Sequence, residues 1–534
     1  MVSIEIDKSD LKNLIGKNLP DEEIEEVLFL IKCEAKINGN KIECELTPDR
    51  PDMFAVEGLA REIKGFLALE TGIKKYDITD SNFFLKKDKA DARPAIACGI
   101  ILDVKLTDEL VKSLMQMQEK LHATIGRNRK RVAIGVHDFD KIKPPLLYTD
   151  VADEKFVPLN ESNEMPVKEI LEHHPKGKDY AHLVKDRYPM LYDKDGVISF
   201  PPIINSERTK VTDGTKNLFI DVTGDDEKLV NQVLNILVCN INERDGRILT
   251  VKVSNRKTPD LEPAKIILDV ELVDKILGLG LSEAQIEETL KRMRYNARRI
   301  KGGKIEIEVP PYRTDILHMI DIVEDVAIGY GYNNIQPILP KIASIGKQNE
   351  LEKLSKKIRE VMIGFEFQEV LNFVLTNEEN NFKKMDTEGK AVEILNPVSS
   401  EYSICRTWLL PSLLKVLSAN KHRNYPQKIF EVGDCISIDE SSEVRTRQTR
   451  KLAAAISYDN ANLTEIKSIL ESALSNLGYA FLIKEFSHPS FLESRCGEIL
   501  INDKPIGFFG ELHPKVLENW KLEKPVIVFE IKIE

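Results

Sequence analysis

The sequence lacks any apolar run long enough to cross a membrane. Its first residues, MVSIEIDKSDLKNL, contain no basic segment followed by an apolar core, so they do not have the pattern of a secretion signal. These absences predict a cytosolic protein with no membrane partner. With 42% hydrophobic and 31% charged residues, the composition is that of a globular chain.

The chain is also poor in cysteine and has no excess of positive charge. Its seven cysteines lie far apart and form no CxxC pair, which excludes a disulfide framework and a structural zinc site. We expect them to be reduced and mostly buried. The net charge of −11 does not indicate a nucleic-acid binder, so any contact with RNA must come from a local patch or from a partner chain.

One stretch of the chain occurs twice. Residues 3–28 align without a gap with residues 265–290, and after one inserted residue KIECEL-TPDRPD matches KIEIEV-PPYRTD. Asp52 thereby pairs with Asp315. Each copy predicts the order strand, helix, helix, strand, turn, helix. The repeat is too long and too widely separated for a solenoid, so it indicates a module used twice around other domains.

The second copy carries an unusually acidic helix in PPYRTDILHMIDIVEDVAIGYGY, residues 310–332. A helix from Ile316 places apolar residues on one buried stripe and Asp315 at its amino end, as a cap. The stripe comprises Leu317, Ile320, Val323, Ala327 and Ile328. Three further acids, Asp321, Glu324 and Asp325, share one face and repel one another unless a positive charge lies among them. Two explanations of this acidic face remain open: it binds a divalent cation, or it is simply solvated. The first copy has Gly58 and Arg61 at the positions of Asp321 and Glu324, so only part of the acidic set is present there.

Between the copies, residues 90–258 predict an α+β domain with strands in AIACGIILDV, RVAIGVHDF, GVISFPPII and KNLFIDVTG, and MPVKEILEHH between them. The polar linker 254–263 ends it. The last domain opens with the amphipathic helix LEKLSKKIREVMIGF. Strands are predicted in FQEVLNFVLT, KIFEVGDCISI, KLAAAISY, CGEILINDKPIGFFGEL and VIVFEIKI, which favours an antiparallel sheet with flanking helices.

Six stretches in order carry a resemblance to a known family: TPDRPDMFAVEGLAREIKGFL, GRNRKRVAIGVHDFDKI, FPPIINSERTKVT, PPYRTDILHMIDIVEDVAIGYGYNNI, NPVSSEYSICRTWLLPSLL and IFEVGD. The whole chain resembles the β subunits of phenylalanine-tRNA ligase, in the shorter form of archaea and the eukaryotic cytosol. The resemblance implies a first module at 1–85, an editing domain at 90–258, an ion-carrying module at 264–340 and a catalytic-like domain at 345–534. The fold class expected is therefore α+β multidomain: duplicated small α/β modules flank an α+β editing-type domain, and a class II synthetase-like antiparallel sheet follows. The inserted oligonucleotide-binding barrel and the anticodon-binding domain of the longer bacterial chains are not expected here.

The resemblance further implies Mg²⁺ on Asp315, Asp321, Glu324 and Asp325, with water or a second chain completing the site. Oxygen ligands without Cys or His suit this ion. It also implies an ATP-dependent α2β2 ligase that acts on tRNA(Phe), with an α subunit as the partner of this chain.

No catalytic residue for aminoacyl transfer is expected on this chain. Adenylate chemistry needs arginines on the ATP phosphates, but Ile429 stands two residues before Glu431, where the second class II motif has an arginine, and the third motif has no counterpart in residues 490–534. Arg406 and Arg495 are predicted to make structural or surface ion pairs. The long first helix and a strand in NPVSSEYS are predicted to form an interface with the α subunit.

The editing domain supplies the other possible chemistry, hydrolysis of tyrosine wrongly attached to tRNA. Asn205, Glu207 and Asp221 near strand ends are candidates to hold the amino group and hydroxyl of a tyrosyl ester, although turn and surface roles remain open. His137 and Asp138 form a candidate hydrolytic pair. The alternative is that His137 is a structural histidine at a strand end. The GRNRKR stretch, with Arg127, Arg129, Lys130 and Arg131, is either an RNA-binding patch or a solvated loop.

Three functions therefore compete. The first is the β subunit of the ligase, with synthesis on the α subunit and editing on this chain. The second is a free-standing hydrolase of misacylated tRNA. The third is a non-enzymatic RNA-binding scaffold. A stable second chain, esterase activity of this chain alone, or neither would distinguish them.

Overall fold

The computed structural model describes residues 1–533. They belong to two compact units, and the boundary between these along the chain falls between Leu339 and Pro340. Both units mix helices with β-sheet, so the molecule is of the α+β class with several sheets. None of the helices in residues 1–533 combines the length and the apolar character that a membrane crossing requires. All seven cysteines are free thiols, six of them buried, as predicted.

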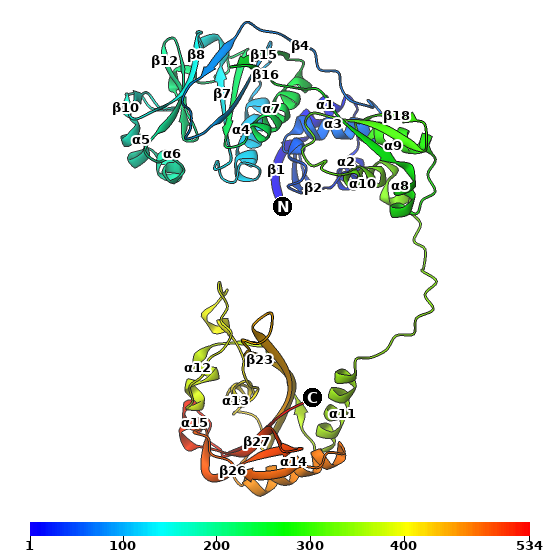
Figure 1. Cartoon of the computed structure of the whole chain (residues 1–534), viewed down its shortest axis with the longest axis vertical. Coiled ribbons are helices and arrows are strands. Elements are labelled where there is room, and N and C mark those ends of the chain that lie inside the picture. The colour runs from blue at the N-terminus through cyan, green and yellow to red at the C-terminus, as the bar shows by residue number, and fades with distance from the viewer. Residues whose placement is uncertain (534) are drawn as a thin grey trace. The chain divides into compact units, whose positions relative to one another are not determined.

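The first repeat copy lies at the start of the first unit (Figure 1). Its strands form an antiparallel sheet in the order β1-β3-β2. The elements are β1 (Val2–Asp7), α1 (Lys8–Ile15), α2 (Asp21–Leu30), β2 (Cys33–Asn38), β3 (Lys41–Leu46) and α3 (Val56–Phe66).

The second copy repeats this sheet in the order β17-β19-β18. Its elements are β17 (Ala264–Asp269), α8 (Val270–Leu277), α9 (Glu283–Arg292), β18 (Asn296–Ile300), β19 (Lys304–Val309) and α10 (Met319–Tyr330). The predicted order is wrong in one respect: it omits one strand from each copy, β2 from the first and β18 from the second. The matched residues have matched roles: Asp7 and Asp269 cap α1 and α8, and Gly16 and Gly278 end them at φ of 76° and 63°. Glycine adopts these positive values without steric cost.

The middle of the first unit is built on one curved sheet of eleven strands (Figure 1). Nine strands follow the order β13-β12-β11-β8-β5-β15-β6-β14-β7, and β4 and β16 pair with β15. The strands are β4 (Ile78–Thr79), β5 (Phe84–Lys87), β6 (Ala95–Leu102), β7 (Val132–Asp138), β8 (Leu146–Val151), β11 (Tyr188–Asp193), β12 (Gly196–Phe200), β13 (Ile204–Asn205), β14 (Leu218–Gly224), β15 (Arg247–Val253) and β16 (Arg256–Thr258).

Helices and a small hairpin complete this region: α4 (Asp108–Ala123), β9 (Lys155–Phe156), β10 (Met165–Pro166), α5 (Val167–His173), α6 (Pro175–Tyr180) and α7 (Glu227–Ile241). Helix α7 packs on β6 and β14. The sheet curls until its two end strands approach each other, since the Asn205 side chain of β13 donates a hydrogen bond to the Val136 carbonyl of β7 at 3.4 Å.

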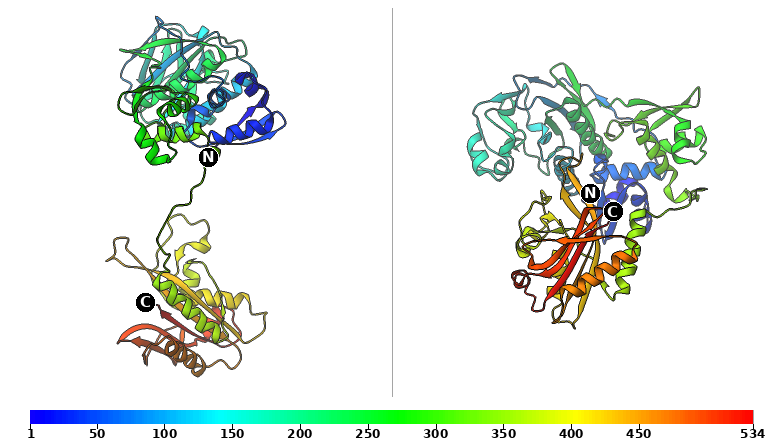
Figure 2. Two further views of the ribbon diagram at one scale, coloured as in Figure 1. Left: turned by 90° about the vertical axis from the view of Figure 1, so that its right-hand side faces the viewer. Right: turned by 60° about the horizontal axis from the view of Figure 1, so that its bottom comes forward.

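The second unit is a seven-stranded sheet between two layers of helices (Figure 2). The strand order is β20-β23-β24-β28-β27-β26-β25, and every neighbouring pair is antiparallel except β20 with β23. The strands are β20 (Gln368–Glu369), β23 (Gln427–Ile438), β24 (Thr446–Ser457), β25 (Leu482–Glu485), β26 (Phe491–Ile501), β27 (Lys504–Leu512) and β28 (Val526–Lys532).

Helices α11 (Glu350–Gly364) and α14 (Leu463–Asn476) pack into the core on one face of this sheet. Helices α13 (Leu410–Ala419) and α15 (Pro514–Asn519) pack into the core on the other. Two predictions are wrong here. The predicted strand 367–376 is two separate short strands, β20 and β21 (Leu375–Thr376), in different sheets, with α12 (Glu378–Asn381) and β22 (Ile404–Cys405) nearby. NPVSSEYS contains no strand, only a 3-10 turn at Ser400–Tyr402.

Candidate functional site

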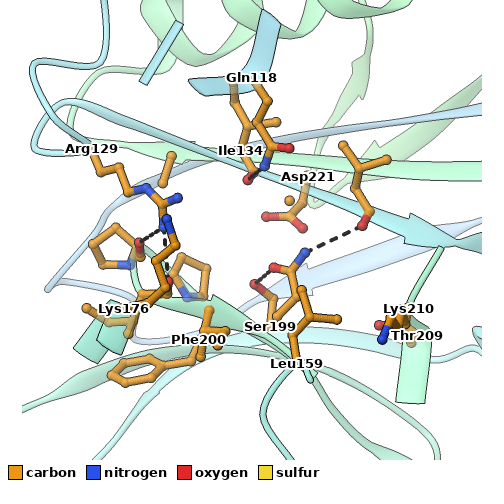
Figure 3. A pocket seen from close by; sticks show the side chains of 18 of the residues that line it. Gln118, Arg129, Ile134, Leu159, Lys176, Ser199, Phe200, Thr209, Lys210 and Asp221 are labelled. Atoms are coloured by element: carbon orange, nitrogen blue, oxygen red, sulfur yellow. Dashed lines mark hydrogen bonds between the residues drawn. The ribbon is translucent and has the colours of Figure 1, made fainter. Parts of the chain in front are cut away.

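A cavity of about 690 Å³ lies where the curved sheet nearly closes (Figure 3). Strands β7 and β14 form one wall, β12 and β13 a second, and α4 a third. The volume is within the range of about 300 to 1,000 Å³ that is typical of pockets for small ligands. Two predicted residues, Asn205 and Asp221, line the cavity.

Alternation along β14 explains why Asp221 faces this cavity. Leu218, Ile220 and Val222 belong to the same core as residues of α7, so they occupy one face of the strand. Side chains at odd positions point to the other face, and there Asp221 and Thr223 line the cavity. Both are buried, with exposed fractions of 1% and 0%.

The Asp221 carboxylate forms a chain of contacts with His137 and Thr209. The Asp221 Oδ1 lies 2.8 Å from His137 Nε2, and His137 Nδ1 lies 2.9 Å from Thr209 Oγ1. In its neutral form His137 therefore donates a hydrogen bond from Nε2 to the carboxylate, which can only accept. Its Nδ1 then accepts a hydrogen bond from the Thr209 hydroxyl. Gly135, opposite Asp221 on β7, leaves the room for this contact, since a Cβ there would stand 2.3 Å from Asp221 Oδ1.

The second Asp221 oxygen, Oδ2, is buried without a hydrogen-bond partner. An unpaired buried carboxylate oxygen is costly, and a donor delivered by a ligand removes that cost. The predicted pair of His137 with Asp138 is wrong. Neighbouring residues on a strand point to opposite faces, and Asp138 accepts instead from the Thr215 hydroxyl at 2.9 Å.

The other predicted pocket residues have different positions. The Asn205 Oδ1 accepts from the Ser199 hydroxyl at 3.1 Å, and its amide bridges to β7, so Asn205 fastens the two ends of the sheet beside the cavity. The Glu207 side chain does not line the cavity among the described residues. Its carboxylate accepts from the Asn160 N–H at 2.6 Å and pairs with Lys210 at 3.1 Å, which indicates a role in holding the neighbouring loop.

Arg129 closes one end of the cavity (Figure 3). Its guanidinium donates to the carbonyls of Pro202 and Ile203 at 3.2 and 3.0 Å and pairs with Glu119 at 3.0 Å. It also stacks over the Tyr180 ring, 4.5 Å from the ring centre. Arg129 is thus part of the wall, whereas Arg127 and Lys130 on the same loop are exposed.

The predicted metal ligands of the second copy are all engaged with other groups. Helix α10 begins at Met319, not Ile316, and His318 caps it, so the predicted cap Asp315 is wrong. Asp321 accepts from the Leu317 and His318 amides at 2.7 Å each, and Glu324 pairs with Lys32 at 2.7 Å. The predicted buried stripe is also wrong at its start, because Leu317 and Ile320 are 83% and 42% exposed.

A buried arginine supplies the positive charge among these acids. Arg313 Nη2 lies 2.7 Å from Asp315 and 2.6 Å from Asp325, and Tyr295 also donates to Asp325. Burial raises the pKa of Asp315, but the Arg313 guanidinium outweighs burial and holds that pKa below its ordinary value. Asp325 and Asp315 are therefore held in place by this ion pair.

The first copy contains the same arrangement. Arg50 lies 2.9 Å from Asp52 and 3.0 Å from Glu62, the positions that match Arg313, Asp315 and Asp325. The two remaining acids, Asp321 and Glu324, have no acidic counterpart. Arg61, at the position of Glu324, is fully buried and stacks 3.7 Å from the centre of the Tyr312 ring in the other copy. Two of the four acids are thus explained by the duplicated ion pair.

This arrangement does not fit a magnesium ion held by all four acids. Within residues 1–533, three or more acidic, His or Cys side chains nowhere converge as metal ligands would. Arg313 lies between Asp315 and Asp325, and a cation there would have to displace the guanidinium. Only Asp321 and Glu324 are free of that pair, and Glu324 is 45% exposed.

In the second unit, two ion pairs lie on the central sheet beside its apolar core. Arg406 pairs with Glu431 at 2.8 Å, as predicted for a structural arginine, and Lys451 pairs with Glu530 at 2.8 Å. The Glu530 carboxylate also accepts from the Leu409 and Leu410 amides at the start of α13. Ile429 is buried in the apolar core of this face. Arg495 lies 3.7 Å from Glu511 and is 59% exposed.

Sequence reasoning missed Thr209, Ser199 and Thr223 as lining residues, and it missed the partner of His137. A signal was available for Thr223, because it stands two residues from Asp221 and therefore on the same face of a strand. No sequence signal links His137 to Asp221, since the contact depends on which strands of a large sheet are neighbours.

Comparison with known proteins gives three domain matches. The family described as phenylalanyl tRNA synthetase beta chain CLM domain matches residues 335–533, the tRNA synthetase B5 domain matches 266–332, and the B3/4 domain matches 110–236.

Two curated relatives match along the whole chain. The phenylalanine–tRNA ligase beta subunit of Methanocaldococcus jannaschii is 44% identical over 100% of both chains, and that of Pyrococcus horikoshii is 44% identical over 99% of both. The crystal structure of an N-terminal fragment of the Pyrococcus horikoshii beta subunit is 40% identical, with a TM-score of 0.59, over 62% of this chain and 99% of the fragment.

Proposed function

Because the chain belongs to the family of phenylalanine–tRNA ligase beta subunits, we propose that it hydrolyses tyrosine wrongly esterified to tRNA(Phe), in the cavity beside Asp221. The observation that carries this proposal is the buried Oδ2 of Asp221, which has no hydrogen-bond partner and lies on the wall of a 690 Å³ cavity. Joining phenylalanine to tRNA is assigned to an α subunit.

The unpaired oxygen explains how a pocket selects tyrosine over phenylalanine. A tyrosine hydroxyl donates a hydrogen bond to Oδ2, whereas phenylalanine leaves this oxygen unpaired in a buried site. A site that is built to hydrogen-bond a hydroxyl rejects the analogue that lacks it far more strongly than an apolar pocket rejects an added hydroxyl. His137 and Thr209 fix the carboxylate so that Oδ2 keeps its direction.

The reaction consumes one water. The water oxygen bonds to the ester carbonyl carbon, the bond from that carbon to the ribose oxygen breaks, and the ribose oxygen takes a proton. The products are tyrosine and tRNA with a free terminal hydroxyl. Asn205 and Ser199, which are hydrogen-bonded to each other at the cavity wall, are the polar groups assigned to the amino group of the ester.

The experiment is deacylation of tyrosyl-tRNA(Phe) by the complex of this chain with its α subunit. Asp221→Ala should lower kcat/KM roughly 10- to 100-fold, because a hydrogen bond to a charged group contributes about 1.5 to 3 kcal/mol. Phenylalanine attachment should be unchanged. Glu207→Ala is the matched control, since Glu207 is not among the described residues that line the cavity. If Asp221→Ala lowers both reactions together, Asp221 is structural and the editing proposal is wrong.

Magnesium remains a second part of the proposal. We propose that Mg²⁺ binds at Asp321 and Glu324, with water and a second chain supplying the other ligands, because Asp315 and Asp325 are occupied by Arg313. Mg²⁺ usually keeps several waters and needs few protein carboxylates. Binding requires Glu324 to leave Lys32.

We further propose an α2β2 assembly with ATP as the substrate of the α subunit. The supporting observation is a set of exposed apolar side chains on the second unit, here called its apolar surface: Leu371, Phe373, Leu395 and Val398, whose exposed fractions are 75% or more. Large apolar groups that gather at a surface mark contacts with another protein.

A further inference from the structure

The loop Gly126–Arg131, between α4 and β7, has a strained backbone. Arg127, Asn128 and Arg129 all have positive φ, at 47°, 53° and 65°. The left-handed region costs a residue with a Cβ roughly 1 to 2 kcal/mol, and three consecutive instances persist only where the surroundings fix them. Such strain concentrates at functional sites.

A buried arginine from a distant part of the chain fixes this loop. Arg93 donates to the Arg129 carbonyl at 3.1 Å and to the Lys130 carbonyl at 3.3 Å. It also bonds the Thr223 hydroxyl and carbonyl, at 3.0 and 2.9 Å, on the strand that carries Asp221. Burial lowers the pKa of Arg93 to about 10. The loop is thereby tied to the wall of the cavity.

The strained path separates the cations of the loop into two groups. Arg129 turns inward and becomes part of the cavity wall, where Glu119 neutralises it. Arg127, Asn128 and Lys130 are exposed, and neither Arg127 nor Lys130 forms an ion pair with any residue from 1 to 533. Arg131 lies 3.6 Å from Asp225. The outward face of the loop therefore offers two uncompensated positive charges and one amide, with no carboxylate of its own.

A further lysine stands at the same end of the cavity. Lys176 lies beside Arg129 (Figure 3). Its side chain is 43% exposed, and its ammonium lies 4.0 Å from Glu119, which already pairs with Arg129. The exposed cations thus gather where the wall formed by Arg129 ends, while Asp221 lies farther along the cavity. A chain of negative groups that entered at this end would place its last residue near Asp221.

We propose that the loop Gly126–Arg131, with Lys176, binds phosphates of the single-stranded 3′ end of tRNA and directs the terminal ester into the cavity. This inference rests on the proposed hydrolysis of a tRNA ester, and it names the part of the substrate that the loop holds. Arg127 and Lys130 act as positioning residues, because they contact the backbone and not the reacting ester. Fixed cations on a pre-formed loop bind phosphate with little loss of loop entropy.

The test uses the full chain and a fluorescent single-stranded RNA of roughly 12 nucleotides, with its dissociation constant measured from about 50 to 200 mM salt. Each phosphate contact on a single strand contributes about 0.7 to the slope of log K against log salt. Arg127→Ala/Lys130→Ala should therefore reduce the slope by about 1.4 and weaken binding roughly tenfold at the low-salt end. The matched control is Lys301→Ala/Lys304→Ala, which removes two exposed, unpaired cations from the hairpin of the second copy.

A slope that is unchanged in the loop variant, or reduced equally in the control, overturns the proposal. A second measurement is deacylation of tyrosyl-tRNA(Phe) by the complex with the α subunit, where the loop variant should raise KM roughly tenfold and leave kcat within about twofold. If the unmodified complex hydrolyses no tyrosyl-tRNA, the proposed function is wrong. The RNA measurement then still decides the role of the loop.

Discussion

At the scale of the residue, buried polar atoms decide what the cavity can do. Arg93 and Arg129 are buried cations that donate largely to carbonyls, with only Arg129 Nε left without a partner, whereas Asp221 keeps one carboxylate oxygen unpaired. A folded protein that satisfies nearly all of its buried polar groups must offset the cost of the exception elsewhere. Several buried polar atoms lack a partner, but Asp221 lines the cavity, so a ligand there can supply the missing donor to its Oδ2.

His122 predicts a dependence of stability on pH. It lies in the last turn of α4, and its Nε2 accepts a hydrogen bond from the Ile134 amide at 2.8 Å. This nitrogen therefore carries no proton in the fold. Burial lowers the pKa of His122; the nearby Glu119 opposes this shift, and Arg129 adds to it. The unfolded histidine, with a pKa of about 6.5, therefore takes up a proton first. Stability is complete above that pH and is lost as the pH falls below it.

The measurement is the urea midpoint between about pH 7.5 and pH 5.5, the range that spans the ordinary histidine pKa. His122→Gln should flatten the fall in stability over this range, although the amide lowers stability at pH 7.5 by disturbing the bond to Ile134. His173→Gln is the control, because that side chain is 67% exposed. An equal pH dependence in His122→Gln and the unmodified chain would show that other groups cause the fall.

Residue chemistry found part of this site from the sequence. Asn205 and Asp221 were identifiable because polar side chains in apolar strands are rarely neutral choices; Asn205 ends β13, whereas Asp221 lies in the middle of β14 and not near its end. Glu207 was misplaced because it follows strand β13 within a 3-10 turn, where alternation no longer tells which way a side chain points. The contact of His137 with Asp221 joins residues 84 positions apart, and a single sequence gives no information on that pairing.

At the scale of the element, the duplicated turn before α3 and α10 is the clearest unit. The same arginine holds the same two acids in both copies, and all six residues are buried or nearly so. Removing one partner from a buried ion pair costs about 3 to 5 kcal/mol, because an unpaired charge stays behind. The acidic pattern of α10 is therefore largely a matter of folding, and only its exposed part is free for a metal ion.

The sequence predicted the order of most elements in the copies but misplaced the start of α10 by three residues. Apolar spacing favoured Ile316, whereas the capping box of His318 and Asp321 sets the boundary at Met319. Hydrogen bonds to the first amides outweigh the burial of one or two apolar side chains, and Leu317 remains exposed. The missing strands β2 and β18 each bury only one residue, so neither carries a clear alternation of apolar and polar side chains.

Magnesium should stabilise the chain through α10. If Mg²⁺ binds at Asp321 and Glu324, a concentration of ten times its dissociation constant should raise the free energy of unfolding by about 1.4 kcal/mol. Glu324→Gln should remove this gain while leaving stability without Mg²⁺ nearly unchanged, since the exposed pair with Lys32 contributes little. The measurement is thermal unfolding of the full chain at constant ionic strength.

The control for this titration is Glu26→Gln, an exposed acid on α2 of the first copy. Glu62 is unsuitable, although it occupies the position that matches Asp325, because it is buried and holds Arg50. An equal response to Mg²⁺ in Glu324→Gln, Glu26→Gln and the unmodified chain would assign the effect to general screening, and the proposed ligands would be wrong.

At the scale of the whole molecule, each unit carries a different kind of surface. The first unit has a cavity of about 690 Å³ with a mainly apolar lining, a few polar groups that include Asp221, and exposed cations at one end. In the described part of the second unit, Arg406 pairs with Glu431 and Lys451 with Glu530 on the sheet, and four large apolar side chains, Leu371, Phe373, Leu395 and Val398, are exposed. The proposed function uses these two surfaces differently, the first for tRNA and the second for a partner protein.

The last prediction concerns this assembly and separates the three competing functions. Purified alone, the chain should not catalyse phenylalanine-dependent pyrophosphate exchange, because Ile429 stands where the motif has an arginine and Arg406 is already paired with buried Glu431. With an α subunit it should form an α2β2 complex that does. Exchange by this chain alone would contradict the assignment of synthesis to the α subunit.

The apolar surface of the second unit provides the structural test of the same prediction. Leu371→Ser/Phe373→Ser should weaken the complex at least tenfold in sedimentation measurements, because each large apolar side chain buried at an interface contributes about 1.5 to 3 kcal/mol. The circular dichroism of the chain alone should not change, since both side chains are exposed. Val444→Ser, a 73% exposed apolar residue on the β23–β24 hairpin, is the control. If the double variant assembles as tightly as the control, the α subunit binds elsewhere.

The same experiments decide between the three functions. If no partner binds at all while tyrosyl-tRNA is still hydrolysed, the chain is a free-standing hydrolase. If no partner binds and no tyrosyl-tRNA is hydrolysed, the chain is a scaffold.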